Sequence, residues 1–366
     1  MMRVLHVTEA MGSGVLSVVD SISRRQAEAG AEVRVLFLPR PETPSDEALR
    51  ARFHPDVILT RLSTGTRLGD LRALHRAMRD VGDLDVVHAH SSFAGAIVRQ
   101  ALSRRRDPST VFYSPHGFAF LRLDLPPVVR AALRLAERRL ARHSTLILTS
   151  PSEFALAQST LAPRRAHQLQ TGVASDTVAR RPRRPDRMRR PVVGMVGRVT
   201  FQKAPWRFAA AARALDDRAD FVWVGAGAPD DETRWFADAP VRVTGWVSPQ
   251  ELAACIDGLD VLLFPSLWEG MSLSLIQAQA QGLPAVVSDV VGNRDAVDDG
   301  VTGFVRGTDE GLIAATALLL DDAGLRERMS AAALDRARRT LTDDRVGEDS
   351  LALYAAGLAP RERTSR

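Results

Sequence analysis

The stretch from 261 to 289 constrains the fold more than any other part of the chain. It reads as a strand (Val261–Phe264), a polar turn, a helix and a second strand (Ala285–Ser288). Gly282, followed by Pro284, is the usual end of a helix. Both strands are short apolar runs, which are typical of parallel strands covered on both faces. The stretch therefore predicts an α/β fold with parallel sheets.

The polar turn of this stretch is the first candidate site. It follows a parallel strand, and open α/β sheets bind their ligands at the carboxyl ends of their strands. The turn holds one carboxylate, Glu269, beside Gly270, with hydroxyls at Ser266 and Ser272. The helix that follows offers free N–H groups and the positive end of its dipole to an anion. These features predict a phosphate site with an acid next to it.

Length and composition indicate two domains. A chain of 366 residues is too long for one ordinary core. The stretch 176–191 is rich in proline and arginine and has no core-forming run, so it is predicted as a linker. It separates a first domain (1–175) from a second (192–340), and a last helix is predicted over 341–358.

Several classes of protein are disfavoured. No apolar run reaches the ~20 residues that span a bilayer, and the chain starts with a strand pattern rather than a signal peptide. Cys255 is the only cysteine, so no internal disulfide can form and a reducing cytosol is expected. Lys and Arg exceed Asp and Glu by 49 − 44 = 5. The basic clusters lack interleaved aromatic residues, so no nucleic acid is expected as a partner.

Two interpretations of the basic clusters stay open. The clusters occur at 104–106, at 180–190 and on a predicted helix over 128–143, whose only acid is Glu137. A solvated surface explains them simply. The alternative is peripheral contact with an anionic membrane.

The first strand, 3–8, leads into Gly12-Ser13-Gly14 and a helix predicted from about Ser17 to Ala29. A dinucleotide site would need a third glycine, where Ser17 stands, and an acid at the end of the second strand, which is absent. An oxidoreductase is therefore disfavoured.

Histidines end two further predicted strands. The strand in 85–92 ends with His88 and His90, and the strand in 111–118 ends with His116 and Gly117. A lone histidine is more often structural than functional, but these lie at the ligand-binding edge of the sheet. The acids at Asp83 and Asp85 resemble a metal-binding D-x-D pattern, yet they precede their strand and so lie at the wrong edge.

The segment P-S-L-W-E-G-M-S-L-S-L-I-Q-A-Q-A-Q-G-L-P-A-V-V (265–287) resembles the donor site of retaining glycosyltransferases of the GT-B fold, in the family 4-like, glycogen-synthase-like group. V-G-R-V-T-F-Q-K (196–203) resembles the same group's G-R-x-x-x-x-K signature. The resemblance implies two Rossmann-like domains that face each other across a cleft, with a final helix that returns to the first domain.

The resemblance also implies roles for individual residues. Arg198 and Lys203, the only lysine, would hold the donor diphosphate, whose negative charge grows as the glycosidic bond breaks. Glu269 would orient the donor sugar, and His116 would line the opposite side. The implied donor-binding residues are Gly12, Gly14, Gly270, Met271, Ser272, Leu273, Gln277 and Gly245, with His90 on the acceptor side.

The expected activity is sugar transfer from a nucleotide diphosphate sugar to a hydroxyl acceptor in polysaccharide, glycolipid or glycoside synthesis. The resemblance implies a reaction that retains the anomeric configuration and needs neither a metal nor a cofactor. The protein is expected in the cytoplasm or at the inner face of the membrane, where a lipid-linked acceptor would lie. One position departs from the pattern, because Gln277 stands where the family has a second acid. Ser274 and Gln277 fit a helix capping box, S-x-x-Q. A catalytically silent relative that binds a nucleotide sugar or a partner protein is the alternative.

Overall fold

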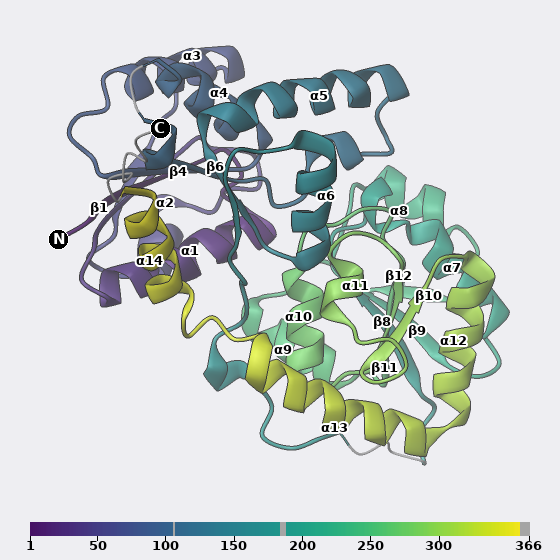
Figure 1. Cartoon of the computed structure of the whole chain (residues 1–366). Coiled ribbons are helices and arrows are strands. Elements are labelled where there is room, and N and C mark those ends of the chain that lie inside the picture. Colours follow the sequence, from purple (N-terminus) through teal and green to yellow (C-terminus); the bar gives the residue numbers. More distant parts are fainter. Residues whose placement is uncertain (105–106, 184–187, 359–366) are drawn as a thin grey trace. The chain divides into compact units, whose positions relative to one another are not determined.

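The computed structural model describes residues 1–104, 107–183 and 188–358. The chain divides into two compact units (Figure 1). Residues 1–121, 127–171 and the chain from 343 onward form the first unit, and residues 122–126 and 172–342 form the second. Each unit contains one sheet whose strands pair in parallel, with helices packed against it. The α/β fold is as predicted.

The first unit has a seven-stranded sheet in the order β3-β2-β1-β4-β5-β6-β7. Its strands are β1 (Arg3–Thr8), β2 (Glu32–Phe37), β3 (Ile58–Arg61), β4 (Val86–His90), β5 (Val111–Ser114), β6 (Thr145–Leu148) and β7 (Ala166–Gln168). Its helices are α1 (Ser13–Glu28), α2 (Asp46–Arg52), α3 (Arg67–Arg79), α4 (Ser92–Leu102), α5 (Pro127–Leu140), α6 (Pro151–Leu161) and α14 (Val346–Leu358).

The register of the first sheet brings histidines together. The parallel pairing of β1 with β4 sets His6 opposite His88. His90 lies two residues after His88, and side chains two apart on a strand point to the same face. All three rings are buried, and that of His88 lies against the ring of Phe112. A polar cluster is thus built into the interior of the unit.

The second unit has a six-stranded sheet in the order β10-β9-β8-β11-β12-β13, the doubly wound arrangement of Rossmann-like domains. Its strands are β8 (Val192–Val196), β9 (Asp220–Val224), β10 (Val241–Val243), β11 (Val261–Phe264), β12 (Ala285–Ser288) and β13 (Gly303–Arg306). Its helices are α7 (Pro205–Ala214), α8 (Pro229–Phe236), α9 (Pro249–Asp257), α10 (Leu273–Ala280), α11 (Asn293–Ala296), α12 (Asp309–Asp321) and α13 (Ala323–Thr340).

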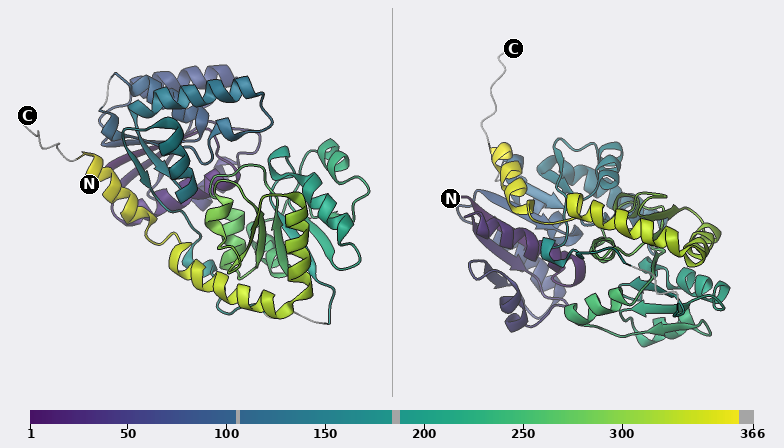
Figure 2. Two further views of the ribbon diagram at one scale, coloured as in Figure 1. Left: turned by 45° about the vertical axis from the view of Figure 1, so that its right-hand side comes forward. Right: turned by 90° about the horizontal axis from the view of Figure 1, so that it is seen from below.

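The last helix belongs to the first unit, as predicted. α14 lies alongside α1, the yellow and purple helices of Figures 1 and 2. The helices meet closely, since a Cβ at Gly347 would lie only 2.5 Å from the backbone of Arg25. Arg25 also forms an ion pair with Asp343, just before α14 (3.1 Å). The first unit is therefore completed by the end of the chain.

The structure differs from the expected elements in several places. α1 begins at Ser13 rather than near Ser17, with Gly12 at its N-cap position. The elements α2, β3 and α3 were not anticipated. Within the predicted linker, Val178 packs with the second unit's core, and the Arg183 guanidinium donates to the carbonyls of Ile256, Asp257 and Gln281 at 2.6–2.9 Å.

Residues 105–106 of the first basic cluster and 184–187 of the predicted linker lie outside the described residues. Among the helices that the structure describes, none is both long enough and apolar enough to cross a bilayer.

Candidate functional site

The loop after β8 carries the two cations that the sequence predicted. Gly197 and Arg198 follow the last residue of β8, and a 3-10 turn (Phe201–Lys203) precedes α7. Arg198 is exposed, and within the described ranges it makes no hydrogen bond or ion pair. Gly197 has a positive φ of 148°, and a Cβ there would lie 3.3 Å from Cε of Lys203. The glycine thus leaves room for the lysine side chain.

Lys203 and Glu269 are brought together by the fold. Lys203 Nζ lies 2.7 Å from Glu269 Oε1, and the two side chains are only 14% and 7% exposed. The ammonium also lies 4.3 Å from the centroid of the Phe264 ring. An ammonium has three N–H groups, so Lys203 can keep this ion pair and still donate to a phosphate oxygen. Partial burial strengthens the field of both charges.

Gln202 connects the loops that carry these charges. Its carbonyl accepts the Leu267 N–H (2.8 Å), and its Nε2 donates to the carbonyl of Trp268 (2.9 Å). The same amide group donates to Glu269 Oε2 at 3.3 Å. Both oxygens of the Glu269 carboxylate are therefore held in place. The role of Gln202 could not be predicted, because its position beside Lys203 is the only indication in the sequence.

The start of α10 faces the same loop. Ser272 is the N-cap residue, and among the described residues no side chain caps the helix, so the N–H groups of Leu273 and Ser274 stay available to a ligand. Gly270 is buried beneath Gly292, where a Cβ would come within 1.3 Å of the Gly270 oxygen. Met271 and Leu273 are half-buried on either side of the N-cap. A helix N-terminus thus lies next to the acid, as predicted.

The capping box expected at Ser274 is wrong. α10 begins at Leu273, so Ser274 is already inside the helix, and Gln277 is its fifth residue. Gln277 is half-buried, and within the described residues its side chain has no hydrogen bond. Gly245 lies after β10 with φ of +79° and open space around it, and the adjacent Trp246 is 70% exposed.

The glycine turn of the first unit opens α1. Gly12 is extended (φ −157°), and a Cβ there would lie 2.8 Å from Glu42 Cγ, so the turn packs against residue 42. Gly14 has open space around it and is exposed. Glu9, just before this turn, is buried and accepts the Ala94 N–H at 2.9 Å. It holds the N-terminus of α4, a role that the sequence did not reveal.

His116 lies in a constrained turn, two residues after the end of β5. Its φ is +53° and that of Gly117 is +94°, and the left-handed region is costly for a residue with a side chain. Glu153 stabilises the turn, because its carboxylate accepts the N–H groups of Gly117 (2.9 Å) and Thr149 (3.0 Å). His116 is half-buried at the ligand-binding edge of the sheet.

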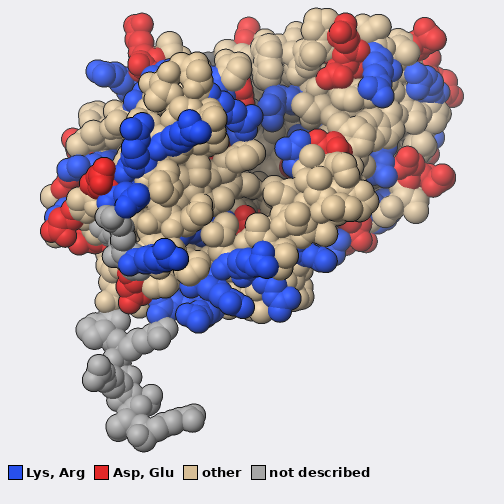
Figure 3. Space-filling view, turned by 90° about the horizontal axis from the view of Figure 1, so that it is seen from above, with Lys and Arg blue, Asp and Glu red and all other residues tan. Residues whose placement is uncertain are grey.

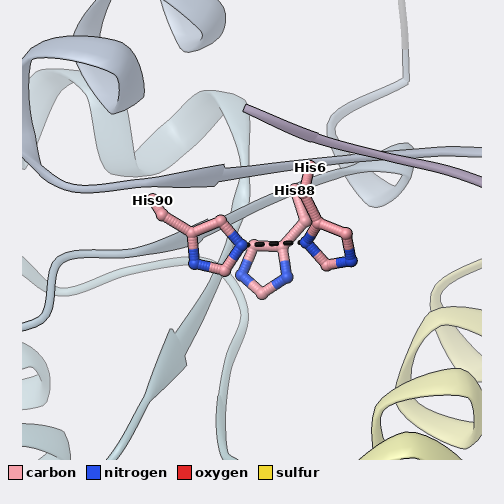
Figure 4. Close-up of side chains that lie close together, drawn as sticks. All are labelled: His6, His88 and His90. Carbon is pink, nitrogen blue, oxygen red and sulfur yellow. Dashed lines mark hydrogen bonds between the residues drawn. The ribbon is translucent and has the colours of Figure 1, made fainter. Parts of the chain in front are cut away.

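The predicted acceptor-side residue, His90, lies deeper. It is 1% exposed and connects His116 (2.9 Å) to His6 (2.9 Å), as Figure 4 shows for the bond with His6. His88 contacts Tyr354 (2.6 Å) and Ser114 (2.9 Å) instead. His90 is therefore too buried to contact a ligand at the surface of the unit, whereas its neighbour His116 is only half-buried.

Burial keeps these histidines neutral. It lowers the pKa of His6 and of His116 to about 4, and it lowers the pKa of His88 and of His90 well below the usual value. Ring nitrogens of His6, His88 and His90 lie within 4.8 Å of one another, a spacing that could hold a metal ion. Each of the six nitrogens already has a hydrogen-bond partner, so a metal would have to displace these bonds.

Both halves of the chain match known families. The model for "Glycosyltransferase Family 4" matches residues 12–177, and the model for "Glycosyl transferases group 1" matches residues 190–322. Among solved structures, sucrose-phosphate synthase from Thermosynechococcus elongatus has a TM-score of 0.81 at 17% identity, over 97% of this chain and 99% of its own. These matches define a glycosyltransferase with the GT-B fold.

Proteins of similar sequence agree with this class. The UDP-Gal:alpha-D-GlcNAc-diphosphoundecaprenol alpha-1,3-galactosyltransferase of Escherichia coli is 26% identical over 71% of this chain and 71% of its own. The alpha-D-kanosaminyltransferase of Streptomyces kanamyceticus is 27% identical over 89% and 95%. The chain belongs to the glycosyltransferases related to family 4.

Proposed function

We propose that this enzyme moves a sugar from a nucleotide diphosphate sugar to a hydroxyl acceptor with retained anomeric configuration, without a metal or a cofactor. The observation that carries the proposal is the Lys203–Glu269 pair, which lies beside the uncapped start of α10. A cation and a helix N-terminus suit a diphosphate, and a carboxylate suits sugar hydroxyls. The name of the Escherichia coli relative, which includes UDP-Gal, supports a nucleotide sugar as donor.

In the proposed reaction the bond between the anomeric carbon and the diphosphate oxygen breaks, and the oxygen keeps the electron pair. The acceptor oxygen forms a new bond to the anomeric carbon from the same face, and its proton passes to the leaving diphosphate. Charge therefore grows on the phosphate oxygens. Arg198, Lys203 and the first N–H groups of α10 would stabilise this charge, in the role that a divalent metal has elsewhere.

Glu269 would orient the donor sugar rather than attack it. Its Oε1 accepts from Lys203 and its Oε2 from Gln202, which leaves lone pairs on both oxygens for sugar hydroxyls. Because the carboxylate is held by two side chains, it can position a sugar at little cost in entropy. Gln277, with its free amide, would bind a ribose hydroxyl.

The test uses the pure protein and a panel of UDP-, GDP-, TDP- and ADP-sugars in the presence of EDTA. We expect slow hydrolysis of one donor, transfer when a suitable acceptor is added, and a product whose anomeric proton coupling in NMR matches that of the donor. Inversion would refute retention, and strict dependence on Mg²⁺ or Mn²⁺ would refute the metal-free mechanism. No turnover of any donor, with binding intact, would favour the catalytically silent relative.

Arg198→Ala tests the diphosphate site directly, with Arg218→Ala as a matched control. Arg218 also lies in the second unit but already pairs with Asp321. Loss of Arg198 should weaken UDP or GDP binding roughly tenfold, as expected for a charged hydrogen bond, and Arg218→Ala should leave it unchanged. Equal effects of the two changes would argue against the assignment.

We also propose that the exposed face of α5 contacts an anionic membrane. The helix exposes Val128 (80%), Val129 (42%) and Leu135 (47%), and its arginines at 134, 138 and 139 are exposed as well. A groove of about 480 Å³ lies beside it, lined by Ala131, Arg134, Leu135, Arg138, Ser159 and Thr160. Figure 3 shows basic side chains, with some acidic ones among them, set in uncharged surface. The mixture suits lipid head groups and acyl chains together.

Vesicle co-sedimentation tests this proposal. Vesicles with phosphatidylglycerol should bind the protein, whereas pure phosphatidylcholine vesicles should not. Arg134→Glu together with Arg138→Glu should abolish binding, and Arg345→Glu, a change at an exposed arginine of the same unit, should have little effect. Equal binding by all three proteins would contradict the role of α5.

A further inference from the structure

A continuous chain of hydrogen bonds connects α14 to the end of β5. It starts at Ser350, passes through Gln26 on α1 and His6 on β1, and reaches His116 through His90. Figure 4 shows the central part, where the rings of His6, His88 and His90 lie side by side. Since each neutral histidine has one N–H and one acceptor nitrogen, the direction of every bond can be worked out.

The direction is set at Ser350. Its hydroxyl donates to the Gly347 carbonyl (2.8 Å), so toward Gln26 it can only accept. Gln26 must therefore turn its NH₂ group to Ser350 Oγ (2.8 Å) and its carbonyl oxygen to His6 Nε2 (2.8 Å). An amide oxygen only accepts, so the hydrogen of His6 is on Nε2.

A second branch fixes the same orientation of Gln26. Ser114 donates to the Ile147 carbonyl (3.0 Å) and so accepts from His88 Nε2 (2.9 Å). His88 Nδ1 then accepts the hydroxyl hydrogen of Tyr354 (2.6 Å). Tyr354 in turn accepts the second amide hydrogen of Gln26 (3.3 Å). The backbone carbonyls of Gly347 and Ile147 thus independently require the same orientation of the Gln26 amide.

The direction continues to the edge of the sheet. With its hydrogen on Nε2, His6 accepts at Nδ1 from His90 Nε2 (2.9 Å). His90 then accepts at Nδ1 from His116 Nε2 (2.9 Å). This leaves His116 Nδ1 without a hydrogen, and within the described ranges it has no protein partner. The burial that keeps these rings neutral at pH 7 makes the assignment unique.

We infer that Gln26, acting through two buried histidines, holds His116 in the Nε2–H tautomer and leaves Nδ1 as an acceptor for a ligand hydroxyl. His116 would touch the ligand, while Gln26, His6 and His90 are positioning residues. The chain passes through the Gln26 amide, which does not take up a proton at neutral pH, so it orients His116 and does not remove a proton from it. This inference rests on the proposed function only in taking the ligand to be a sugar.

The decisive measurement is the tautomer of His116 in the unaltered protein. Two-bond ¹H–¹⁵N correlation spectra of ¹⁵N-histidine-labelled protein at pH 7, without ligand, distinguish protonated from unprotonated ring nitrogens. We expect a single Nε2–H form for His116, assigned by the signal that His116→Gln removes. An Nδ1–H form or an averaged mixture would overturn the inference, whatever the fate of the proposed activity.

Gln26→Leu tests the source of the orientation, with Gln100→Leu as a matched control on an exposed glutamine of the same unit. The first change should convert His116 to an averaged mixture of tautomers, and the control should not. An unchanged tautomer in a folded Gln26→Leu protein would overturn the inference. If that variant does not fold, the measurement on the unaltered protein still decides.

Activity provides a further readout. Gln26→Leu should lower kcat roughly three- to tenfold, as expected for loss of one oriented neutral hydrogen bond, with binding of free UDP or GDP unchanged. Metal content checks the competing explanation. One equivalent of tightly bound Zn²⁺ that disappears in His88→Gln would mean that the three rings are ligands, and the hydrogen-bond assignment would then be wrong.

Discussion

The two units place different chemistry at the carboxyl edges of similar sheets. All eight histidines of the chain lie in the first unit, and the only lysine lies in the second. At its edge the first unit has a neutral hydrogen-bonded network, in which His116 Nδ1 has no partner among the residues that the structure describes. The second unit has the charged Lys203–Glu269 pair beside the start of α10. A neutral network fixes the direction of hydrogen bonds without a strong electric field, whereas charged groups produce an electric field that stabilises phosphate. The comparison indicates a division of labour between orientation and charge stabilisation.

The largest effect is expected when the cation of the charged pair in the second unit is removed. Lys203→Ala should lower kcat roughly 10²–10³-fold, the usual cost of removing one preorganised donor at a developing charge. It should also leave the Glu269 carboxylate near the diphosphate without its counter-charge. Steady-state transfer assays measure the change, and Arg218→Ala is the control. Transfer as fast as in the parent protein would show that Lys203 does not act on the diphosphate.

The second-largest expected effect is that acid pH lowers the stability of the first unit more than that of the second. The pKa of His6 is lowered to about 4 in the folded protein, against 6.5 for the ordinary group. Between these values the unfolded chain binds a proton that the folded chain does not, so stability is full above pH 6.5 and falls as the pH falls toward 4. The loss from His6 alone should reach ~3 kcal/mol. The second unit has no histidine and should lack this dependence.

Urea unfolding at pH 7 and at pH 5 measures the difference. All five tryptophans lie in the second unit, so their fluorescence follows that unit, and pulse proteolysis follows fragments of the first. A larger loss of stability in the second unit would contradict the origin of the effect in buried histidines.

A smaller effect tests whether Glu269 acts through its negative charge or only through the position of its oxygen atoms. Glu269→Gln keeps the shape and the acceptor oxygen but removes the negative charge next to Lys203. Transfer should fall about tenfold, because a hydrogen bond to a charged group contributes ~1.5–3 kcal/mol and a neutral one ~0.5–1.5. Binding of free UDP or GDP, measured by calorimetry, should be unchanged or tighter. Weaker nucleotide binding would place Glu269 at the nucleotide rather than at the sugar.

The smallest effect concerns Gln277. Gln277→Glu should leave donor binding unchanged or tighten it up to about tenfold, because a carboxylate accepts a ribose hydroxyl more strongly than an amide does. Titration calorimetry with the donor measures this, and Gln281→Glu at the C-cap of α10 is the control. Weakened binding would mean that Gln277 does not face the ribose.

Local sequence patterns predicted the second unit well. The bounds of β11 and β12 agree with the predicted strands, since apolar runs between turn residues are local signals. The N-terminus of α10 was misjudged because serines at 272 and 274 are equally good caps by residue type. Just before the helix start, Gly270 packs against Gly292, a contact between positions distant in sequence that residue types do not reveal.

The histidine network could not be predicted in the same way. The hydrogen bond between Gln26 and Ser350 connects residues that are 324 positions apart, and that between His88 and Tyr354 spans 266. Strand ends pointed to His90 and His116, but their connection depends on sheet register and on the packing of α14 against α1. Such partners have no periodicity or motif that a single sequence displays.

The position of α14 has a consequence for biosynthesis. A ribosome makes the first 171 residues of this chain early, yet Gln26 and His88 complete their hydrogen bonds only when residues 350 and 354 leave the exit tunnel. Until then the first unit contains buried groups with incomplete hydrogen bonds. By that point residues 172–342 of the second unit already include its whole sheet. The part of the protein that is translated first is therefore the part that is finished last, and a stop codon a few residues before Ser350 would leave it incomplete.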